Sequence, residues 1–252
     1  VPSSSALICF PVRILVRAML FRAAQVCMFC GNHLGNTCYI ARAMIAEVCC
    51  GLEYRMGSGP GHRRRWLRTE RRKTTAVVYV FHPDLAGSVV NRALAGAVAE
   101  LDDVLVRNMY AQYPNYAIDV EAEHELIEGA DAVVLQFPLY WYSTPSLMKK
   151  WLDDILTEGW AYGEGGTRLR GKKVMLALSA EVDEKYYCTG GGLEGAVGFE
   201  ISQLLSPLEA TMRFVGMEWL TPFRTFGTMH ISKERVAERA REYADAVREL
   251  AG

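Results

Sequence analysis

One stretch constrains the fold more than any other: residues 132–154, AVVLQFPLYWYSTPSLMKKWLDD. It opens with an apolar run, Ala132 to Phe137, that is long enough for one buried strand, and Pro138 ends the run. Thr144 can cap a helix and Pro145 can occupy its first position. The apolar residues that follow recur at helical spacing: Leu147, Met148, Trp151, Leu152 and Ile155. A buried strand followed by a helix predicts half of a parallel α/β unit.

Three consecutive aromatic residues, Tyr140, Trp141 and Tyr142, lie between this strand and this helix. Ligands of open α/β sheets bind at the carboxyl ends of the strands. The three aromatics are therefore candidates for contact with a flat aromatic ligand. The alternative is that Trp141 and Tyr142 only fill a core, because aromatic side chains dominate cores as well.

The net charge of -1 conceals two unlike parts of the chain. Residues up to Lys73 contain 12 Lys and Arg against 3 Asp and Glu, a balance of +9, and the remaining residues contain 16 against 26, a balance of −10. Six of the seven cysteines precede residue 51. We therefore expect an irregular, poorly ordered extension over 1–73 that ends in a basic linker, and one α/β domain over 74–252.

Composition also argues against several classes of protein. The acidic larger part gives no reason to expect nucleic acid as a partner. Its single cysteine, Cys188, argues against a disulfide framework and fits the cytoplasm. No apolar run reaches the ~18 residues of a membrane span. The group of Cys27, Cys30, His33 and Cys38 matches no established zinc spacing, so we expect no metal site.

The larger part alternates strands with helices. We expect strands over 75–81, 104–109, 132–137, 172–178 and 219–223, and a loop over 111–118. Helices are expected to start after the caps Ser88, Asp119, Thr144 and Ser232, and at Pro207. This alternation predicts a doubly wound, five-stranded parallel sheet in the order 2-1-3-4-5, covered by helices on both faces.

The first predicted strand leads through a polar loop to a helix N-terminus. His82 follows the strand, Ser88 can cap the helix and Asn91 lies in its first turn. Free backbone N–H groups and the positive end of the helix dipole suit a phosphate. This strand-to-helix loop contains neither GxGxxG nor GxxxxGK[ST], the two common nucleotide-binding fingerprints. Taken alone, a cap serine and a lone histidine are more often structural.

The predicted strand order makes this loop and the aromatic loop neighbours. The first and third strands end side by side at the point where the strand order reverses. Residues 82–91 would then hold a phosphate, and residues 139–142 would hold a flat ring. A phosphate site beside a ring site is the layout of a flavin site.

Residues 74–252 resemble the flavodoxin-like NAD(P)H:quinone oxidoreductases. They are most similar to the bacterial branch that includes ancillary proteins of glutathione-gated potassium efflux systems. The resemblance rests on four motifs, none of them in residues 1–73: His82-Pro83 with Ser88 and Asn91; Pro138-x-x-Trp141-Tyr142-Ser143-x-Pro145 with Lys149, Trp151 and Asp153; Gly159-Trp160-Ala161-Tyr162-Gly163; and Pro207 with Gly216 and Pro222-Phe223.

The resemblance implies a flavoenzyme. NAD(P)H would give a hydride to the bound flavin, and a quinone or similar acceptor would then receive it. The resemblance also implies a homodimer with its sites at the interface. FMN is expected, with FAD as the alternative, because no segment of 74–252 is evidently devoted to an adenine.

The resemblance also implies roles for individual residues. The phosphate and ribityl chain would be held by His82, Ser88, Val89, Val90 and Asn91. The flavin ring would be lined by Leu139, Tyr140, Trp141 and Tyr142. The pyrimidine end would face the backbone N–H groups of Ala180, Glu181, Val182 and Asp183. Tyr187, or its neighbour Tyr186, would act as a catalytic proton or hydrogen-bond donor to the acceptor.

Two departures from the family pattern bear on these roles. Relatives often have glycines where this chain has Ala180 and Glu181, and a carboxylate there opposes a reduced, anionic flavin unless it points away. Some relatives also use a histidine downstream, and Leu193 stands at that position here, which argues against a proton relay.

Two other functions remain open. One is a regulatory ancillary subunit of a potassium efflux transporter, located at the inner face of the cell membrane. The other is a flavodoxin-type electron carrier. The aromatic loop and the following Lys149-x-Trp151 pair favour an oxidoreductase over a small carrier.

Overall fold

The computed structural model of the protein describes residues 75–190 and 193–251. All of these belong to one compact unit, Arg68–Gly252. The expectations for residues 1–73, including the poorly ordered extension, the basic linker and the cysteine-rich segment, lie outside the described residues.

The described residues form a parallel sheet in the strand order β2-β1-β3-β4-β5, which confirms the predicted order. A sixth strand, β6, pairs with β4 off this path. The strand bounds are β1 Ala76–Val80, β2 Val104–Asn108, β3 Ala132–Pro138, β4 Lys173–Ser179, β5 Glu218–Trp219 and β6 Phe223–Thr225. Every residue of β1 and β3 is buried, as continuous apolar runs predict for strands covered on both faces.

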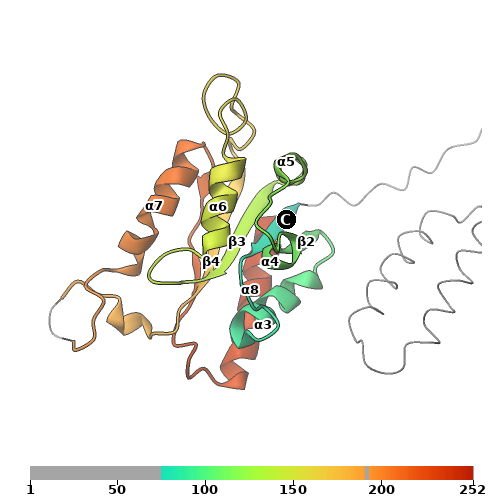
Figure 1. The fold of residues 1–252 in the computed structure, drawn as a ribbon. Helices are drawn as coiled ribbons and strands as arrows, with labels where there is room; N and C mark the ends of the chain where they lie inside the picture. The colour runs from blue at the N-terminus through green and yellow to red at the C-terminus, as the bar shows by residue number, and fades with distance from the viewer. Residues whose placement is uncertain (1–74, 191–192, 252) are drawn as a thin grey trace, which may run out of the picture. The chain divides into compact units, whose positions relative to one another are not determined.

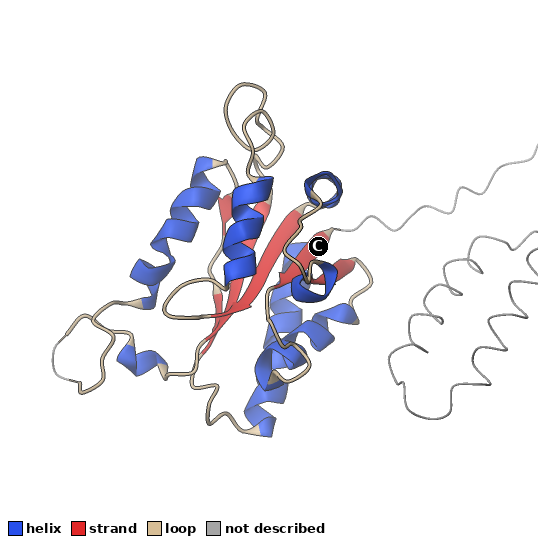
Figure 2. Cartoon of the chain, viewed as in Figure 1, coloured by secondary structure: helices blue, strands red, loops and turns tan. Residues whose placement is uncertain are grey.

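Helices cover both faces of the sheet (Figures 1 and 2). The side chains of α3 (Val89–Ala99) and α8 (Lys233–Ala251) share one core cluster with Ala76, Val78 and Val80. The other cluster combines Val77 and Tyr79 with α5, α6 and α7. Alternate residues of β1 therefore serve opposite cores, because successive side chains of a strand point to opposite faces. The bounds of this second group are α5 Val120–Gly129, α6 Ser146–Ile155 and α7 Ile201–Phe214.

Three of the predicted helix caps are confirmed. The Ser88 hydroxyl oxygen accepts a hydrogen bond from the Asn91 N–H (3.2 Å), and the Asp119 carboxylate accepts one from the Ala122 N–H (3.1 Å). At α8, the Ser232 hydroxyl oxygen accepts a hydrogen bond from the Arg235 N–H (3.1 Å). Each side chain satisfies a donor that the helix itself leaves unpaired.

Two predicted helix starts are wrong. α6 begins at Ser146, with Pro145 in the cap position and no side-chain cap, so Thr144 does not cap it. α7 begins at Ile201 and contains Pro207 in its interior. Glu200 and Gln203 cap each other at its start. The Gln203 carbonyl cannot receive an N–H from Pro207 and accepts the Ser206 hydroxyl instead (2.7 Å).

Two smaller segments also differ from expectation. Residues Met109–Gln112 form a short helix, α4, where the sequence predicts the end of a strand and the start of a loop. The predicted last strand over 219–223 is two strands, β5 and β6, which pair with different parts of β4. A short 3-10 helix, η1 (Glu184–Tyr186), follows β4. Among the described residues, no helix combines the length and the apolar character needed to cross a membrane.

Candidate functional site

A cavity of about 210 Å³ opens at the carboxyl ends of the central strands, where the strand order reverses. We call it the switch-point cavity. Its lining is His82, Ser88, Val89, Val90, Asn91, Pro138, Leu139, Tyr140, Ser179, Glu181 and Thr228. Eight of the 14 residues predicted for the site are in this lining: His82, Ser88, Val89, Val90, Asn91, Leu139, Tyr140 and Glu181. The structure therefore brings together the loops after β1, β3 and β4, as the strand order predicts.

The first turn of α3 supplies free donors to this cavity. The N–H groups of Val89 and Val90 have no acceptor within the helix, because a helix leaves its first N–H groups unpaired. The Ser88 oxygen already accepts the Asn91 N–H, so its own hydrogen remains available. The positive end of the helix dipole adds to these donors. This edge of the cavity suits an anion.

His82 contributes one more neutral donor. Its Nδ1 accepts a hydrogen bond from the Asp84 N–H (3.2 Å), so the ring proton lies on Nε2. Burial lowers the pKa of His82, and Asp84 only partly opposes this effect. Asp84 itself accepts the Gly87 N–H (3.0 Å), and a Cβ at Gly87 would lie 2.3 Å from the second carboxylate oxygen. Glycine at this position therefore lets the loop close over Asp84.

Asn91 lines the cavity, but its side-chain amide is already hydrogen-bonded within the protein. Its side chain is buried and donates to the Ser179 hydroxyl on β4 (2.9 Å). Gln136 on β3 donates to the Asn91 carbonyl (2.8 Å). The start of α3 is thereby tied to two strands, and Gln136 Oε1 remains buried without a hydrogen-bond partner in the described structure.

The aromatic loop is a tight, self-contained turn. Tyr140 and Ser143 exchange two backbone hydrogen bonds (3.0 and 2.9 Å) around Trp141 and Tyr142. These two residues have φ values of 47° and 62°, as in a type I′ turn. Such backbone costs about 1–3 kcal/mol per non-glycine residue and clusters at functional sites. Trp141 is 93% exposed and Tyr142 46% exposed, which contradicts the alternative that they only fill a core.

Backbone hydrogen bonds with residues 225–228 hold the loop after β4, residues 180–183. Ala180 donates its N–H to the Thr225 carbonyl (2.9 Å) and accepts the Thr228 N–H (3.1 Å). Val182 accepts the Gly227 N–H (3.1 Å). The N–H groups of residues 181–183 form no hydrogen bond within the described residues. Glu181 lines the cavity and forms no ion pair with any of the described residues.

Six predicted site residues lie outside the lining: Trp141, Tyr142, Ala180, Val182, Asp183 and Tyr187. Tyr187 is buried, and its ring packs against Phe226 with centroids 5.3 Å apart. Burial raises the pKa of Tyr187, and the nearby Tyr142 and Glu181 raise it further. Burial also raises the pKa of Tyr140, as do Glu181 and Asp84. Both phenols are therefore protonated at neutral pH.

Three lining residues were not predicted as site residues: Pro138, Ser179 and Thr228. Ser179 is the last residue of a strand that was predicted to end at 178. Thr228 reaches the cavity only because β6 pairs with the end of β4. A continuous strand over 219–223 gives no reason to place it there, and no motif signals it.

A second cavity, of about 290 Å³, lies between α6 and α7. We call it the α6–α7 cavity. It shares Leu139 with the switch-point cavity, and Tyr142 from the aromatic turn also lines it. Its walls are mainly apolar, with Leu152 and Leu156 from α6 and with Leu204, Leu205 and Leu208 from α7.

The donor set of the switch-point cavity fits a flavin mononucleotide. One edge offers neutral donors at a helix N-terminus, which suits a phosphate. The aromatic turn and the loop after β4 offer unpaired N–H groups, which suit the carbonyl oxygens of a flat ring. The described residues contain no cluster of His, Cys, Asp and Glu that could hold a metal ion.

Comparison with known proteins agrees with this geometry. A family model described as a flavodoxin-like fold matches residues 74–250. The uncharacterized NAD(P)H oxidoreductase YrkL of Bacillus subtilis is 43% identical over 169 residues, which is 67% of this chain and 95% of YrkL. The ancillary protein KefF of the glutathione-regulated potassium-efflux system, from Enterobacter sp., is 38% identical over 167 residues, 66% of this chain and 91% of KefF.

A solved structure also supports this family relationship. General stress protein 14 from Treponema denticola, in complex with FMN, is 36% identical and superimposes with a TM-score of 0.66. The match covers 70% of this chain and 99% of that protein. The chain therefore belongs to the flavodoxin-like fold family, together with these NAD(P)H oxidoreductase and ancillary-protein relatives.

Proposed function

We propose that the protein is an FMN-dependent NAD(P)H:quinone oxidoreductase, in which a hydride from NAD(P)H reaches a quinone-type acceptor by way of the bound flavin. One observation carries this proposal. Three groups of unpaired backbone N–H donors, at 89–90, 141–142 and 181–183, come from the three loops that meet at the switch-point cavity. The name of YrkL supports the reaction class, and the FMN complex of general stress protein 14 supports the cofactor.

The start of α3 holds the phosphate in this proposal. Ser88, the N–H groups of Val89 and Val90, and the Nε2–H of His82 are its donors. Among the described residues no Lys or Arg lines the cavity, so the helix dipole and neutral donors balance the phosphate charge. Asn91 acts through the position of this turn, because its amide is already bonded to Ser179.

The remaining loops orient the ring. Leu139 and Tyr140 pack against it, and the N–H groups of residues 181–183 bind the oxygen-bearing pyrimidine end. The flavin, when bound, supplies the hydride chemistry. The exposed rings of Trp141 and Tyr142 provide a flat apolar edge for a quinone, and Tyr187, which is protonated at neutral pH, donates a hydrogen bond to the acceptor oxygen.

The proposal also includes a homodimer of this chain. The α6–α7 cavity is mainly apolar and its lining residue Tyr142 is exposed, as are Phe199 and Phe214 at the two ends of α7. Exposed apolar surface of this kind marks protein interfaces. We expect a homodimer that covers this cavity, measured by sedimentation equilibrium of the full chain. A monomer at micromolar concentration would refute this part.

The similarity to KefF favours a second candidate function. The protein would then be a cytoplasmic ancillary subunit that binds a potassium efflux transporter at the inner face of the membrane. Co-purification of the tagged full chain with such a transporter tests this candidate. Recovery of the chain without any transporter, under conditions in which KefF retains its own, would exclude it.

The deciding experiment is the visible spectrum of the purified full chain, before and after anaerobic addition of NADPH. A flavin spectrum that bleaches on addition supports the proposal. A colourless protein that takes up neither FMN nor FAD refutes it. Parallel double-reciprocal plots would then support successive use of one site by NAD(P)H and acceptor, and intersecting plots would count against it.

A further inference from the structure

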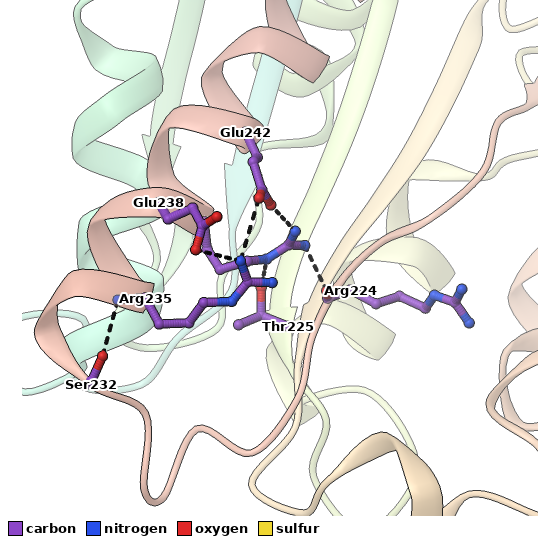
Figure 3. Close-up of polar contacts among 7 residues, drawn as sticks. Arg224, Thr225, Ser232, Arg235, Glu238 and Glu242 are labelled. Atoms are coloured by element: carbon purple, nitrogen blue, oxygen red, sulfur yellow. Dashed lines mark hydrogen bonds and ion pairs between the residues drawn. The ribbon is translucent and has the colours of Figure 1, made fainter.

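A polar cluster joins the C-terminal helix to the strand beside the switch-point cavity. It consists of Arg239 and Glu242 on α8 with Arg224 and Thr225 on β6, and we call it the α8–β6 clamp. Arg239 donates to the Arg224 carbonyl (2.7 Å) and the Thr225 hydroxyl (3.4 Å), and it forms an ion pair with Glu242. Figure 3 shows the carboxylate of Glu242 joined to arginine guanidinium groups on α8, while the Arg224 side chain extends away from the helix.

The clamp is connected to the loop after β4 at both ends. At the start of that loop, the Thr225 carbonyl accepts the Ala180 N–H (2.9 Å). At its other end, the Arg224 guanidinium lies 3.6 Å from the Glu184 carboxylate in η1. The residues between these two attachments are 181–183, whose N–H groups form no hydrogen bond within the described residues, and Glu181 among them lines the cavity.

The shape of Arg239 suits this position. Its guanidinium lies over the Phe223 ring, 4.0 Å from the centroid, while its N–H groups reach three acceptors at once. A planar guanidinium can stack and donate in several directions, which an ammonium group cannot do. Thr225 is buried, so the hydroxyl and carbonyl that the clamp holds have little competition from water.

We propose that Arg239 is a positioning residue for the flavin: by holding β6 against β4, it orients the N–H groups of residues 181–183 toward the pyrimidine end. This inference rests on the proposed function. It extends that function by assigning a role to a residue on α8 that does not line the cavity.

The clamp has different consequences for the two redox states. Hydrogen bonds to a charged acceptor are stronger than those to a neutral one. A reduced flavin carries more negative charge at its pyrimidine end than an oxidised flavin. Disordered N–H donors would therefore weaken the reduced state more than the oxidised state, which lowers the midpoint potential. The phosphate end, held by α3, would be unaffected.

The test compares three variants of the full chain: Arg239→Ala, Arg239→Lys and Arg235→Ala. Arg235 is the matched control, because it lies on the same helix and bonds Glu238 and Glu242 without contacting β6. The measurements are the dissociation constant of FMN by fluorescence quenching, the midpoint potential by anaerobic redox titration and the melting temperature.

We expect Arg239→Ala to bind oxidised FMN a fewfold more weakly and reduced FMN about tenfold more weakly, the effect of losing one hydrogen bond to a charged group. Its midpoint potential should therefore become more negative. Arg239→Lys should fall between this variant and wild type, because one donor can still reach the Arg224 carbonyl. Arg235→Ala should match wild type in both measurements.

Wild-type affinity and potential in Arg239→Ala would overturn the inference while leaving the proposed function intact. If Arg239→Ala does not fold, the test uses Arg239→Lys instead. Wild-type FMN affinity and midpoint potential in Arg239→Lys would then overturn the inference. An equal shift in Arg235→Ala would also overturn it, because the effect would then belong to the charge of α8. A wild-type chain that takes up no flavin overturns both proposals.

Discussion

Two clusters of arginine and carboxylate groups hold elements to the sheet, and their environments differ. The Glu123 cluster lies beneath α5, where a fully buried Glu123 accepts from Arg107 (2.5 Å), the Tyr113 hydroxyl (2.6 Å) and Trp151 Nε1 (3.3 Å). In the α8–β6 clamp, the Glu242 side chain is 39% exposed. The first cluster ties the edge strand β2 to the core, and the second lies beside the switch-point cavity.

This difference in exposure predicts different roles for the two clusters, one in the stability of the fold and the other in the position of a loop. Removing one partner of a buried ion pair leaves the others uncompensated in a dry core, and the cost is large. A partly exposed pair contributes little to stability, because water and salt screen it. The Glu123 cluster should therefore govern unfolding, and the clamp should govern the properties of the bound cofactor.

The largest expected effect is that of Glu123→Ala. The substitution leaves the Arg107 guanidinium and two further donors without an acceptor, so the free energy of unfolding should fall by about 3–5 kcal/mol. Urea titration followed by circular dichroism measures this loss. Glu125→Ala, an exposed carboxylate on the same helix, is the control and should change stability by less than about 0.5 kcal/mol. Equal losses of unfolding free energy in both variants would show that the buried Glu123 contributes no more to stability than an exposed carboxylate.

The next effect concerns alkaline pH. Burial, followed by the hydrogen bond to Glu123, raises the pKa of Tyr113 to about 12. The folded state therefore keeps this proton more tightly than the unfolded state, whose phenol has the ordinary value of 10.0. The stabilisation is complete below pH 10 and is lost as the pH rises toward 12.

Tyr113→Phe isolates this contribution. The variant should lose about 1 kcal/mol of stability at neutral pH, because Glu123 keeps its other donors. Its stability should then fall less steeply than that of the wild type between pH 10 and 12. Urea titrations of both proteins across this range measure the difference. Parallel pH profiles would show that the phenol does not titrate with unfolding.

A smaller effect is expected for Glu181→Gln, which tests how charge at the cavity affects the bound cofactor. The Glu181 carboxylate lines the cavity and opposes negative charge there. Its removal should tighten binding of reduced FMN relative to oxidised FMN by about two- to fivefold, as for an exposed, screened charge. The midpoint potential should rise, opposite in sign to the change in Arg239→Ala. An unchanged potential would mean that the carboxylate points away from the ring.

The smallest effect is expected for Trp141→Asn. Asparagine tolerates the left-handed backbone of the turn better than tryptophan does, so stability should rise by about 0.5 kcal/mol. The KM for a quinone should increase, because an exposed flat contact is lost, while the affinity for FMN stays the same. Thermal unfolding and steady-state kinetics measure the two quantities. A loss of stability would show that the exposed indole has a packing role.

The parts of the fold that follow local rules could be predicted from the sequence. Ser88, Asp119 and Ser232 cap helices because each lies directly before an amphipathic segment. The strand order follows from the alternation of strands and helices, which leaves few parallel topologies. The neighbouring positions of residues 82–91 and 139–140 follow directly from that order.

The parts that depend on distant contacts could not be predicted. Pro207 indicates a helix start by local rules, but the capping pair at Glu200 and Gln203 starts α7 earlier. Nothing near Thr228 indicates that it reaches a cavity built from β1, β3 and β4. Its position depends on backbone bonds between β6 and the loop after β4, and such pairing has no signature in a short sequence window.

The place of β6 and α8 after the other elements of the domain has a consequence for biosynthesis. A growing chain can assemble β1 through β4, the first turn of α3 and the aromatic turn before β6 and α8 are made. The wall formed by Thr228 and the hydrogen bonds to residues 180 and 182 appear only when β6 docks, and α8 holds it there. The switch-point cavity is therefore complete only after β6 and α8 have been synthesised and have docked.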